Sequence, residues 1–592
     1  MNQIILIHSK ILKNKKVFKT QTYYNIYFIS LMILMLFSLR SNLNASNSNN
    51  INVLILSGKN NHKWQVTTPA IQNILEGSGR FNVTVKNNPE DLNPSELEQY
   101  DVILSNWNTW PDVTGERWNP DLEKAFLDFI SGGKGFVNIH AGSSTLQDWP
   151  EFQQIAGGTW GLDVTGHGPI HTFKVSIDDK NHPVMRGLKD FYIKDELWNN
   201  TNFHPDIHVV CSAYSTPAKK GTDKNEPVVV TTEYGKGRGF YTVLGHNKAS
   251  MQNSAWKTIL LRGTEWAATG KVTIPALEPW PVNSEIAERQ SKYWEQSDTT
   301  IALMNGYKIV WQFNFPKIGK PYFHPLNTVD GYTLTWLSPP DHHWHYALWF
   351  SWKYINGINY WEEDKTTNLA KGLTEVIKHT ISLNNDLSAQ IVLQISYHPP
   401  NSDNVLTENR TIYVSPSDEK GNYYINWESD FKANNKDVVL ERTPIEGQDE
   451  GRRWGGYATL GLRMNTETLT GISLLNDEGK KGLDIHTTPT KWTDISGIIQ
   501  EDTTKSAGVT IFDSNKNPRH PVPGYVIDSE NGEWPRFVYS NPGFLYNSGY
   551  TIKAGKTLKL SYRVLVHDGI GKVKELNDIY NNYNLSKSRV VK

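Results

Sequence analysis

The sequence predicts an α/β domain with a mainly parallel sheet, followed by an all-β domain that is an antiparallel sandwich. From Asn52 to about Gly270, short apolar runs alternate with amphipathic helix patterns. This alternation is typical of a parallel sheet that carries helices on both faces. Farther along the chain, short alternating runs separated by Gly, Asn, Asp and Pro turns dominate, and they favour an antiparallel sandwich.

The chain has 592 residues, which is too long for a single hydrophobic core, so two or more domains are expected. The composition changes near Pro275, Pro279 and Pro281, which indicate a linker. We expect a signal peptide and disordered leader in 1–50, the α/β domain in 51–272, a linker in 273–297, the sandwich in 298–570 and a tail in 571–592.

The amino terminus predicts export. Lysines between positions 10 and 19 precede an apolar run at 27–37, and a polar stretch follows. The apolar run is shorter than the ~20 residues of a comfortable membrane span. We interpret it as a bacterial secretory signal peptide cleaved near Ala45, which predicts a periplasmic or cell-surface protein. An uncleaved anchor is the alternative and would be the chain's only expected link to a membrane.

The overall composition limits the class of partner. A formal net charge of −1 argues against nucleic acid, which needs a basic face. The single cysteine, Cys211, lies in an apolar run, so we expect a buried core residue and no intramolecular disulfide. The 21 Trp and 27 Tyr favour contact with sugar rings, although the buried core of a sandwich uses aromatic residues just as heavily.

The first domain contains recognisable strands and helices. Pro120 opens a helix with Leu122, Phe126 and Ile130 on one face, and a glycine pair ends it. A later helix carries Trp256 on its apolar face. The strands are expected at 53–56, 81–85, 101–104, 136–139, 227–230 and 239–244.

His140 follows the strand at 136–139 and lies at a small-residue turn. A hydrolase elbow of this shape would carry Ser or Cys at that position. The chemistry of the site is therefore expected to be acid–base or metal-assisted, rather than acyl transfer through a covalent enzyme intermediate.

Other side chains that can carry chemistry also follow strand ends, namely His62, His167, Glu196 and His246. Open α/β sheets place ligands at the carboxyl ends of their strands, so we expect these residues and His140 to form one site. Imidazoles and a carboxylate that converge in this way can be metal ligands or acid–base pairs. A lone histidine is more often a hydrogen-bonded loop residue, but four at the strand ends of one sheet favour function.

The residues of this first site have separate expected roles. The catalytic candidates are His140, His167, Glu196 and His246. The expected ligands of a divalent metal such as zinc are His140, His167 and His246. Contacts with substrate are expected from His62, Trp64 and Trp149.

The motifs of the first domain resemble those of the ThuA family, trehalose-utilisation proteins with a flavodoxin-like fold of the class I glutamine amidotransferase type. The amidotransferase nucleophile is absent, with His140 near its place, so glutaminase activity is not implied. The resemblance implies processing of glycosides or their 3-keto derivatives. It covers roughly 52–272 and depends on motifs that occur in order, at 57–68, 136–149, 166–169, 182–183, 195–196, 233–235 and 245–246.

A second polar cluster lies at 338–345, where an aspartate, three histidines and a tryptophan occur together. On a strand, His343 and His345 would share one face, whereas in a loop any pair could converge. A His-rich aromatic surface patch is the alternative to a site. We expect a second catalytic site formed by His324, Asp341, His342, His345 and Arg463.

Arg463 lies on an otherwise apolar strand and must be paired if it is buried. It is therefore either a clamp for an anion or hydroxyl group, or one member of a structural ion pair. Further contacts between this second site and substrate are expected from Trp349, Trp361, Arg519 and His520.

The second domain resembles the PmoA-type family, labelled methane oxygenase, over roughly residues 300–570. The resemblance depends on 320–361, 513–520 and 562–569. A particulate methane enzyme needs membrane spans, which an exported β-domain lacks. The His-rich strand also resembles aldose-mutarotase-type sandwiches, so these resemblances imply an all-β module associated with sugar degradation.

The leading functional hypothesis is an exported carbohydrate-active protein. It would process a glycoside or an oxidised (3-keto) sugar by hydrolysis, elimination or isomerisation. The alternative is a non-catalytic glycan-binding or scaffold protein, which aromatic richness suits equally well. A third possibility is that one domain is active and the other positions the substrate. The oligomeric state is left open.

Overall fold

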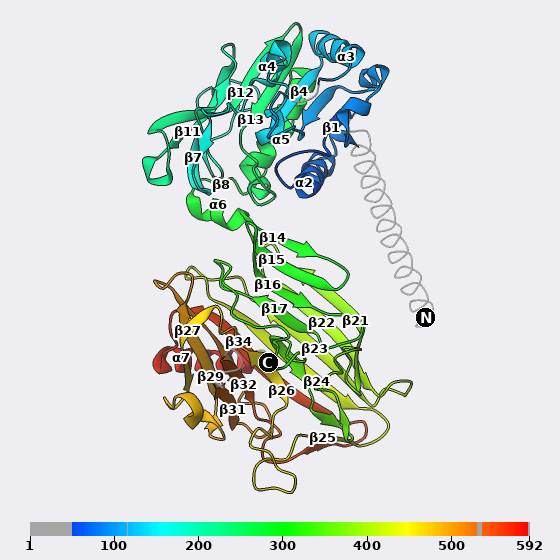
Figure 1. The fold of residues 1–592 in the computed structure, drawn as a ribbon, viewed down its shortest axis with the longest axis vertical. Coiled ribbons are helices and arrows are strands. Elements are labelled where there is room, and N and C mark those ends of the chain that lie inside the picture. The colour runs from blue at the N-terminus through cyan, green and yellow to red at the C-terminus, as the bar shows by residue number, and fades with distance from the viewer. Residues whose placement is uncertain (1–49, 115–116, 530–535, 590–592) are drawn as a thin grey trace, which may run out of the picture.

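The computed structural model describes residues 50–114, 117–529 and 536–589, which form two domains joined by a narrow neck (Figure 1). The leader predicted at the amino terminus lies outside the described residues, up to position 49. Within the described part of the chain, none of the helices has the length and apolar character needed to cross a membrane.

A nine-stranded sheet forms the centre of the first domain, in the order β2-β1-β3-β4-β13-β12-β11-β7-β8. The first five strands in this order pair in parallel, and the others join antiparallel. The predicted α/β class is therefore confirmed. The strands of this sheet are β1 (Ile51–Leu56), β2 (Phe81–Lys86), β3 (Val102–Ser105), β4 (Gly135–Ile139), β7 (His171–Ile177), β8 (Phe191–Asp195), β11 (His208–Ser215), β12 (Lys224–Tyr234) and β13 (Gly237–Thr242).

Helices cover both faces of this sheet because alternate residues of a strand point to opposite sides. Val53 and Ile55 of β1 pack with α2 and α5 in one core, whereas Leu54 and Leu56 pack with α3 and α4 in the other. The buried Cys211 belongs to the first of these cores, as expected. The helices are α2 (Trp64–Gly77), α3 (Pro120–Ser131), α4 (Pro150–Ala156) and α5 (Ser254–Thr269).

The strand directions bring several chain segments to one edge of the sheet. β1, β4 and β13 are parallel, so their carboxyl ends meet there. Four antiparallel steps separate β8 from β13, so β8 runs in the same direction and its end joins them. Two short pairs lie outside this sheet, formed by β5 (Gly158–Thr159) with β10 (Asn202–Phe203) and by β6 (Gly166–His167) with β9 (Trp198–Asn199).

The region expected as a linker, 273–297, contains regular structure. Its helix α6 (Ser284–Gln290) packs on β7 and β8 of the first domain. There Glu288 accepts hydrogen bonds from Thr172 and from Lys194 at 2.7 Å. The next element, β14 (Lys292–Gln296), already belongs to a sheet of the second domain, so the neck between the domains is short.

The second domain is built from antiparallel sheets, and the predicted all-β class is confirmed. One sheet has nine strands, in the order β14-β15-β16-β17-β18-β26-β32-β31-β28. After β14, its strands are β15 (Thr300–Asn305), β16 (Lys308–Asn314), β17 (Tyr322–Leu326), β18 (Leu348–Ser351), β26 (Thr459–Arg463), β28 (Pro489–Thr490), β31 (Val522–Ser529) and β32 (Phe537–Pro542).

An eight-stranded sheet and a small four-stranded sheet complete this domain. The eight strands are β21 (Leu373–Leu383), β22 (Ala389–His398), β23 (Leu406–Val414), β24 (Tyr423–Ala433), β27 (Leu469–Asn476), β29 (Trp492–Ile499), β30 (Ser506–Asp513) and β34 (Thr557–Asp568). The four strands are β19 (Tyr354–Ile355), β20 (Ile358–Asn359), β25 (Val438–Glu441) and β33 (Tyr550–Ile552).

The two large sheets share one hydrophobic core. Tyr423, Ile425 and Trp427 alternate along β24 and are buried, whereas the residues between them are partly exposed. Trp427 lies in the same cluster as Trp311 of the nine-stranded sheet. Alternation of this kind, with one face of each sheet turned inward, produces a sandwich core.

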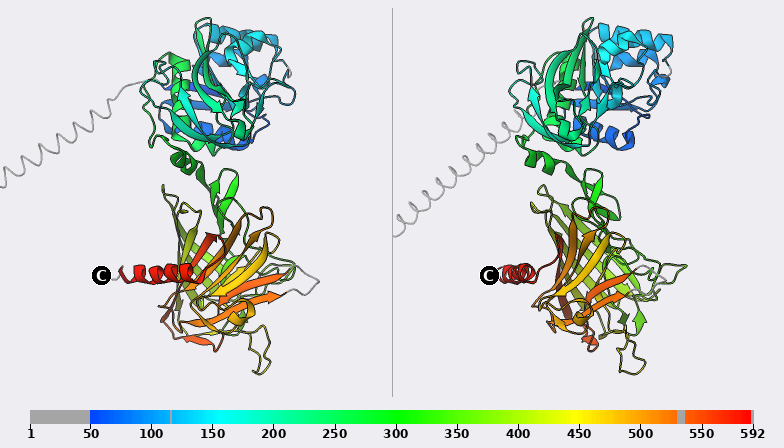
Figure 2. Two further views of the ribbon diagram at one scale, coloured as in Figure 1. Left: turned by 90° about the vertical axis from the view of Figure 1, so that its left-hand side faces the viewer. Right: turned by 60° about the vertical axis from the view of Figure 1, so that its left-hand side comes forward.

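A carboxyl-terminal helix, α7 (Val573–Arg589), lies within the segment expected as a tail. Its Leu576, Tyr580 and Tyr583 pack with Trp492 and Phe512 of the eight-stranded sheet in a separate small cluster. The side views in Figure 2 show this helix projecting beside the sandwich. They also show the green strands that follow α6 as the part of the second domain nearest the first.

Candidate functional site

His140 lies where β4 turns into a short 3-10 helix, His140–Ser143. Its φ of 47° is in the left-handed region, which is uncommon for a residue other than glycine and clusters at functional sites. The turn is tight, since a side chain on Gly142 would lie 2.4 Å from the carbonyl oxygen of Ser105. His140 donates its Nδ1–H to the Val243 carbonyl at 2.6 Å. Its Nε2 therefore carries a free lone pair.

The side chains of His62, Glu196 and His246 surround this nitrogen atom. Nδ1 of His246 lies 3.2 Å from Nε2 of His140. Glu196 places one carboxylate oxygen 3.7 Å from His140 Nε2 and the other 3.5 Å from His246 Nδ1. The ring of His62 lies 4.8 Å from that of His140 and 4.7 Å from that of His246. One ligand atom from each of these four residues lies within 4.8 Å of all the others.

Neighbouring groups hold these side chains in place. The fully buried Asp195 accepts hydrogen bonds from the backbone N–H groups of Gly245 at 2.6 Å and His246 at 3.2 Å. The Ser250 hydroxyl donates to the same carboxylate at 2.7 Å. Trp198 donates its indole N–H to Glu196 at 2.9 Å. These hydrogen bonds to Asp195 hold the turn after β13 against the end of β8.

The protonation states of these four side chains favour metal binding. Burial, together with the neighbouring histidines, lowers the pKa of His140 well below its usual value and that of His62 to about 4. Burial opposes ionisation of Glu196, but the hydrogen bond from His246 and the nearby imidazoles outweigh it and lower its pKa to about 2. Burial also opposes protonation of His246, yet Glu196 outweighs it and raises the pKa of His246. His62, His140 and Glu196 therefore present free lone pairs at neutral pH.

This arrangement fits a divalent transition metal. A tetrahedral zinc site with bonds of about 2.0–2.1 Å places its donor atoms about 3.3 Å apart. The spacings of 3.2 and 3.5 Å from His246 to His140 and Glu196 and of 3.7 Å from His140 to Glu196 lie near that value, and all four ligand atoms lie within 4.8 Å of one another. Three imidazoles and a carboxylate are donors that suit Zn²⁺ and its first-row neighbours.

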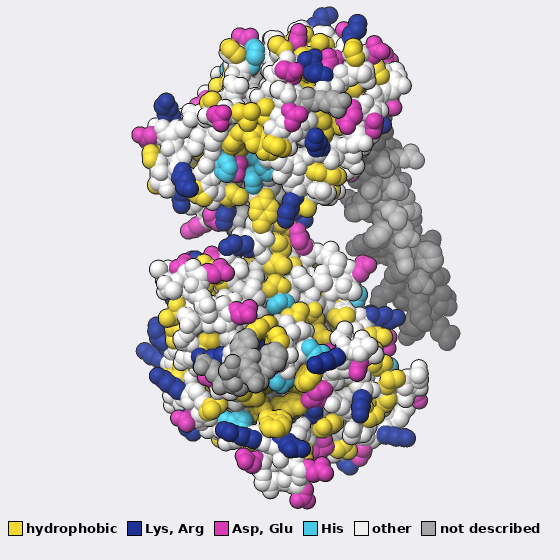
Figure 3. All heavy atoms as spheres, viewed as in Figure 1, with side chains coloured by type: hydrophobic (Ala, Val, Ile, Leu, Met, Phe, Trp, Pro, Cys, Tyr) yellow, Lys and Arg dark blue, Asp and Glu magenta, His cyan; other side chains and the backbone are white. Residues whose placement is uncertain are grey.

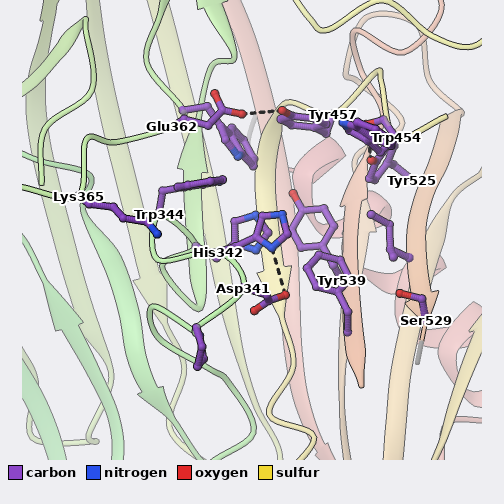
Figure 4. Close-up of a pocket in the computed structure, with 15 residues that line it drawn as sticks. Asp341, His342, Trp344, Glu362, Lys365, Trp454, Tyr457, Tyr525, Ser529 and Tyr539 are labelled. Carbon is purple, nitrogen blue, oxygen red and sulfur yellow. Dashed lines mark hydrogen bonds and ion pairs between the residues drawn. The ribbon is translucent and has the colours of Figure 1, made fainter. Parts of the chain in front are cut away.

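The second domain contains a cavity of about 700 Å³ (Figure 4). Asp341 and His342 form one part of its wall, and Glu362 and Lys365 contribute further charges. Figure 4 shows Glu362 and Tyr457 linked on the side opposite Asp341, and their hydrogen bond measures 2.6 Å. The aromatic part of the wall is formed by Trp344, Trp361, Trp454, Tyr457, Tyr525, Phe537 and Tyr539.

Arg463 and Asp341 form an ion pair behind this wall. Nη2 of Arg463 donates to both carboxylate oxygens of Asp341, at 2.9 and 3.1 Å. The guanidinium stacks 3.7 Å from the ring centre of Phe537. Burial lowers the pKa of Arg463 to about 10. Of the two roles left open for Arg463, the geometry supports the structural ion pair.

Two histidines of the segment 338–345 stack on each other beside the ion pair of Arg463 and Asp341. The rings of His342 and His345 lie 4.6 Å apart and are nearly parallel. Nδ1 of His342 lies 3.1 Å from Asp341. His345 is 5% exposed, and burial lowers its pKa well below the usual value. Its Nδ1 has no hydrogen-bond partner among the described residues, so His345 is a neutral imidazole with an unused polar atom.

The comparisons with known proteins identify the first domain. Residues 52–267 match the family described as trehalose utilisation, ThuA. A putative ThuA-like protein from Parabacteroides merdae is 31% identical; the match covers 40% of this chain and 95% of that protein, with a TM-score of 0.36. The chain belongs to the ThuA family through this domain.

Two further solved structures are similar to the chain. A putative ThuA-like protein from Bacteroides uniformis is 19% identical over 39% of this chain and 98% of that one, with a TM-score of 0.30. A glutamine amidotransferase from Thermotoga maritima is 14% identical over 37% and 91%, with a TM-score of 0.23. None of the curated proteins compared matches the chain.

The second domain matches a different family. Residues 300–581 match DUF6807, which is described as a family of unknown function. The similarity of this domain to PmoA-type proteins therefore stays a prediction, and its function has to be argued from its own cavity.

In the ThuA domain, the structure changes the roles expected for two histidines. His62, expected to contact substrate, is the fourth member of the potential metal cluster. His167, expected as a metal ligand, lies beside the cluster instead, with Nδ1 3.1 Å from Glu196 and 2.8 Å from the Gly168 carbonyl. Its side chain is 44% exposed.

The two tryptophans expected to contact substrate in the ThuA domain differ in position. Trp149 is 2% exposed and packs against Phe126 and Phe152. The expectation for Trp149 is therefore corrected, because its ring belongs to the core around α3 and α4. Trp64 is the first residue of α2 and is partly buried, two positions after His62.

In the second domain, two residues expected in the site lie outside the cavity. His324 on β17 contacts Thr335 at 3.2 Å and is not part of the wall. Trp349 is fully buried and packs behind His345. Trp361, by contrast, reaches the cavity although only 1% of it is exposed.

The two residues expected at 519 and 520 have structural roles. Arg519 donates to the backbone carbonyls of Phe544, Ser548 and Gly549. His520 lies between Asp513 at 2.7 Å and Tyr580 of α7 at 3.0 Å. Both expectations of substrate contact are corrected, because these side chains are occupied in holding loops and the terminal helix.

Several residues of the cavity had not been expected. Tyr525 and Ile527 alternate along β31, and Phe537 and Tyr539 alternate along β32, so each pair shares one face of its strand. That alternation is the one signal the sequence offered for them. The wall also includes Trp454, which is 57% exposed.

Proposed function

We propose that the ThuA domain binds a divalent transition metal at His62, His140, Glu196 and His246 and processes an oxidised (3-keto) sugar by proton transfer. The supporting observation is the convergence of four donor atoms within 4.8 Å of one another. The low pKa values of His62, His140 and Glu196 leave their lone pairs free near pH 7.

Among the reactions expected, elimination or isomerisation suits this site better than glycoside hydrolysis. Glycosidases use a pair of carboxyl groups, one of which stays protonated as general acid. Glu196 has a pKa of about 2 and cannot hold a proton near neutrality. Burial raises the pKa of Asp195, but its carboxyl group is fully buried and bonded to the turn after β13, where it cannot reach a substrate. Neither residue is suited to act as that acid.

His167 is our candidate for the proton carrier. Its Nδ1 is held between Glu196 and the Gly168 carbonyl, so the proton on Nδ1 leaves Nε2 as the basic atom. A carboxylate that fixes the tautomer of an exposed imidazole is the usual way to orient a general base. A divalent ion, when bound, supplies Lewis acidity toward a carbonyl oxygen. His167 would then remove a proton from the carbon next to that carbonyl, which leaves an enolate. In an isomerisation it would return this proton to the enolate at a different position. In an elimination the bond from the neighbouring carbon to its leaving oxygen would break, and His167 would pass the proton to that oxygen.

The test uses the full chain loaded with Zn²⁺ or Co²⁺ and a panel of 3-keto glycosides with their unoxidised parents. The proposal predicts turnover of the keto compounds, loss of turnover after chelation and recovery on adding the metal back. Turnover of the parent glycosides alone, with no response to chelator, would contradict it. The predicted leader adds the proposal that this activity is exported.

A second candidate function is carbohydrate binding by the cavity of the second domain. Its volume of about 700 Å³ suits a small saccharide. Aromatic rings offer apolar faces for sugar rings, and Asp341, Glu362 and Lys365 can bond to hydroxyl groups. Calorimetry with a panel of mono- and oligosaccharides tests this function. Trp454→Ala should weaken binding at least tenfold, and Tyr214→Ala, at an exposed aromatic residue of the ThuA domain bonded to Asp223, serves as the control.

A further inference from the structure

The hairpin of β15 and β16 reaches from the second domain to the metal cluster of the ThuA domain. The two strands are joined by two residues, Gly306 and Tyr307. Gly306 has a φ of +64°, as the first central residue of such a tight turn requires. Tyr307 therefore stands at the outermost point of the hairpin. It is 50% exposed, unlike the aromatic residues of the sandwich core.

Tyr307 contacts the turn that carries a cluster residue. Its ring centre lies 6.2 Å from that of His246, with the two planes almost perpendicular. Nζ of Lys63, the residue after His62, lies 5.6 Å from the centre of the same ring. The Asn247 side chain is a hydrogen-bond partner of Tyr307, and the charge of Glu196 lies within reach. A phenol hydroxyl can both donate and accept hydrogen bonds, so Tyr307 brings a donor to the edge of the cluster.

A small hydrophobic contact fixes the hairpin in this position. Ala249, which follows the turn after His246, is buried together with Tyr293, Ala302 and Met304 of the second domain. Lys248 lies with its Nζ 4.7 Å from the ring centre of Tyr293 and 3.9 Å from a carboxylate oxygen of Glu295. The second domain thus packs against the same turn that supplies His246.

The molecular surface also shows the histidines of the first domain next to the neck between the domains. Figure 3 shows histidine side chains gathered on the side of the first domain nearest the neck, where hydrophobic side chains of the neck adjoin them. A half-exposed tyrosine beside polar groups suits contact with a sugar, since its ring face is apolar and its hydroxyl is polar.

We infer that the second domain completes the ThuA-domain site, with Tyr307 as a substrate-binding residue that stacks on the sugar ring and donates a hydrogen bond to one of its oxygens. This inference rests on the proposed function, because it concerns the sugar of that same site. It gives the fusion of the two domains a direct role. The ThuA domain supplies the donor atoms of the cluster, and the β-domain supplies a wall against which the sugar lies.

One experiment tests the position of Tyr307 with a readout that is independent of activity. Cys211 is buried, so Tyr307→Cys in the full chain introduces an accessible thiol for a trifluoromethyl label. Co²⁺ at the cluster should shift or broaden the ¹⁹F resonance of this label. The same label at Tyr214→Cys, an equally exposed tyrosine bonded to Asp223 in the ThuA domain, serves as the control. Equal effects at both positions would overturn the inference.

A second measurement tests the role of Tyr307 in binding. Calorimetry with methyl 3-keto-α-D-glucopyranoside should show at least a tenfold weaker affinity for Tyr307→Ala and a smaller loss, about threefold, for Tyr307→Phe. Co²⁺ affinity should stay within twofold of the wild-type value, and Tyr214→Ala should change neither quantity. Unchanged sugar affinity in Tyr307→Ala with Co²⁺ still bound would overturn this inference and leave the proposed function standing. Wild-type protein that binds neither Co²⁺ nor the sugar would overturn both.

Discussion

Nε2 of His140 lies 3.2 Å from Nδ1 of His246, although 106 positions separate the two residues in the chain. The contact exists because β4 and β13 are adjacent parallel strands whose carboxyl ends meet at one edge of the sheet. His140 keeps its Nε2 free by donating its other nitrogen to the Val243 carbonyl. Two imidazole nitrogens at this spacing, with Glu196 beside them, form the centre of the site.

Loss of either histidine should abolish tight metal binding. His140→Ala and His246→Ala should lower Co²⁺ affinity by more than the roughly 10–100-fold that loss of an outer-shell partner costs. Equilibrium titration of the visible Co²⁺ spectrum measures the change. His208→Ala is the matched control, because His208 is an exposed histidine paired with Asp179 outside the cluster. Affinities that agree among all three variants would contradict the assignment of the ligands.

Metal affinity should depend on pH through a single proton. Between pH 5 and the raised pKa of His246, Glu196 and His62 are already deprotonated, because their pKa values are about 2 and about 4. His246 keeps its proton up to a pH above its ordinary value, and the metal has to displace it. The logarithm of the Co²⁺ affinity should therefore rise by about one per pH unit over this range and level off above it. A slope near zero, or near three, would contradict these protonation states.

His167 should affect proton transfer without affecting metal binding. His167→Asn should lower kcat on a 3-keto glycoside by roughly 10²–10⁴-fold, the usual contribution of a general base. Its Co²⁺ affinity should stay close to that of the wild type, because His167 lies outside the four-residue cluster. His171→Asn is the control, since His171 bonds only to the nearby Pro169 carbonyl in the hydrogen bonds described. A normal kcat in His167→Asn would remove His167 from the mechanism.

The ion pair of Arg463 and Asp341 should dominate the local stability of the second domain. Asp341→Asn leaves a buried guanidinium without its charge partner, and Arg463→Met leaves a partly buried carboxylate. Each change should lower the free energy of unfolding of that domain by roughly 3–5 kcal/mol. The double variant should recover much of the loss, because no unpaired charge remains. Calorimetric unfolding of the four proteins measures the coupling, and simple additivity would contradict it.

The fold class could be predicted from the sequence because its signals are local. The alternation of apolar runs and helix patterns sets the α/β domain, and the alternation along strands such as β24 sets the sandwich. The terminal helix α7 was missed, although it packs Leu576 and Tyr580 on the sheet. Its contacts also explain why His520, which bonds to Tyr580, belongs to the structure rather than to a binding site.

The site itself was only partly predictable. His140 and Glu196 directly follow β4 and β8, and His246 lies four residues after β13, so the topology of the sheet brings them together. His62 lies in a loop and His167 lies in a short strand pair, and no periodicity in the sequence predicts the path of either segment. The sequence therefore predicts His167 as a metal ligand and His62 as a substrate contact, whereas the structure places His62 in the cluster and His167 beside it. The contact of Tyr307 with His246 joins two domains, and such a contact has no local signature in either segment.

The metal content of the purified protein tests the central claim most directly. Full-length protein prepared without chelator, and its His140→Ala/His246→Ala double variant, should be compared by elemental analysis after exposure to an equimolar mixture of first-row divalent metals and desalting. We expect about one transition-metal ion per wild-type chain and almost none in the double variant. Equal metal contents in the two proteins, or none in either, would contradict it.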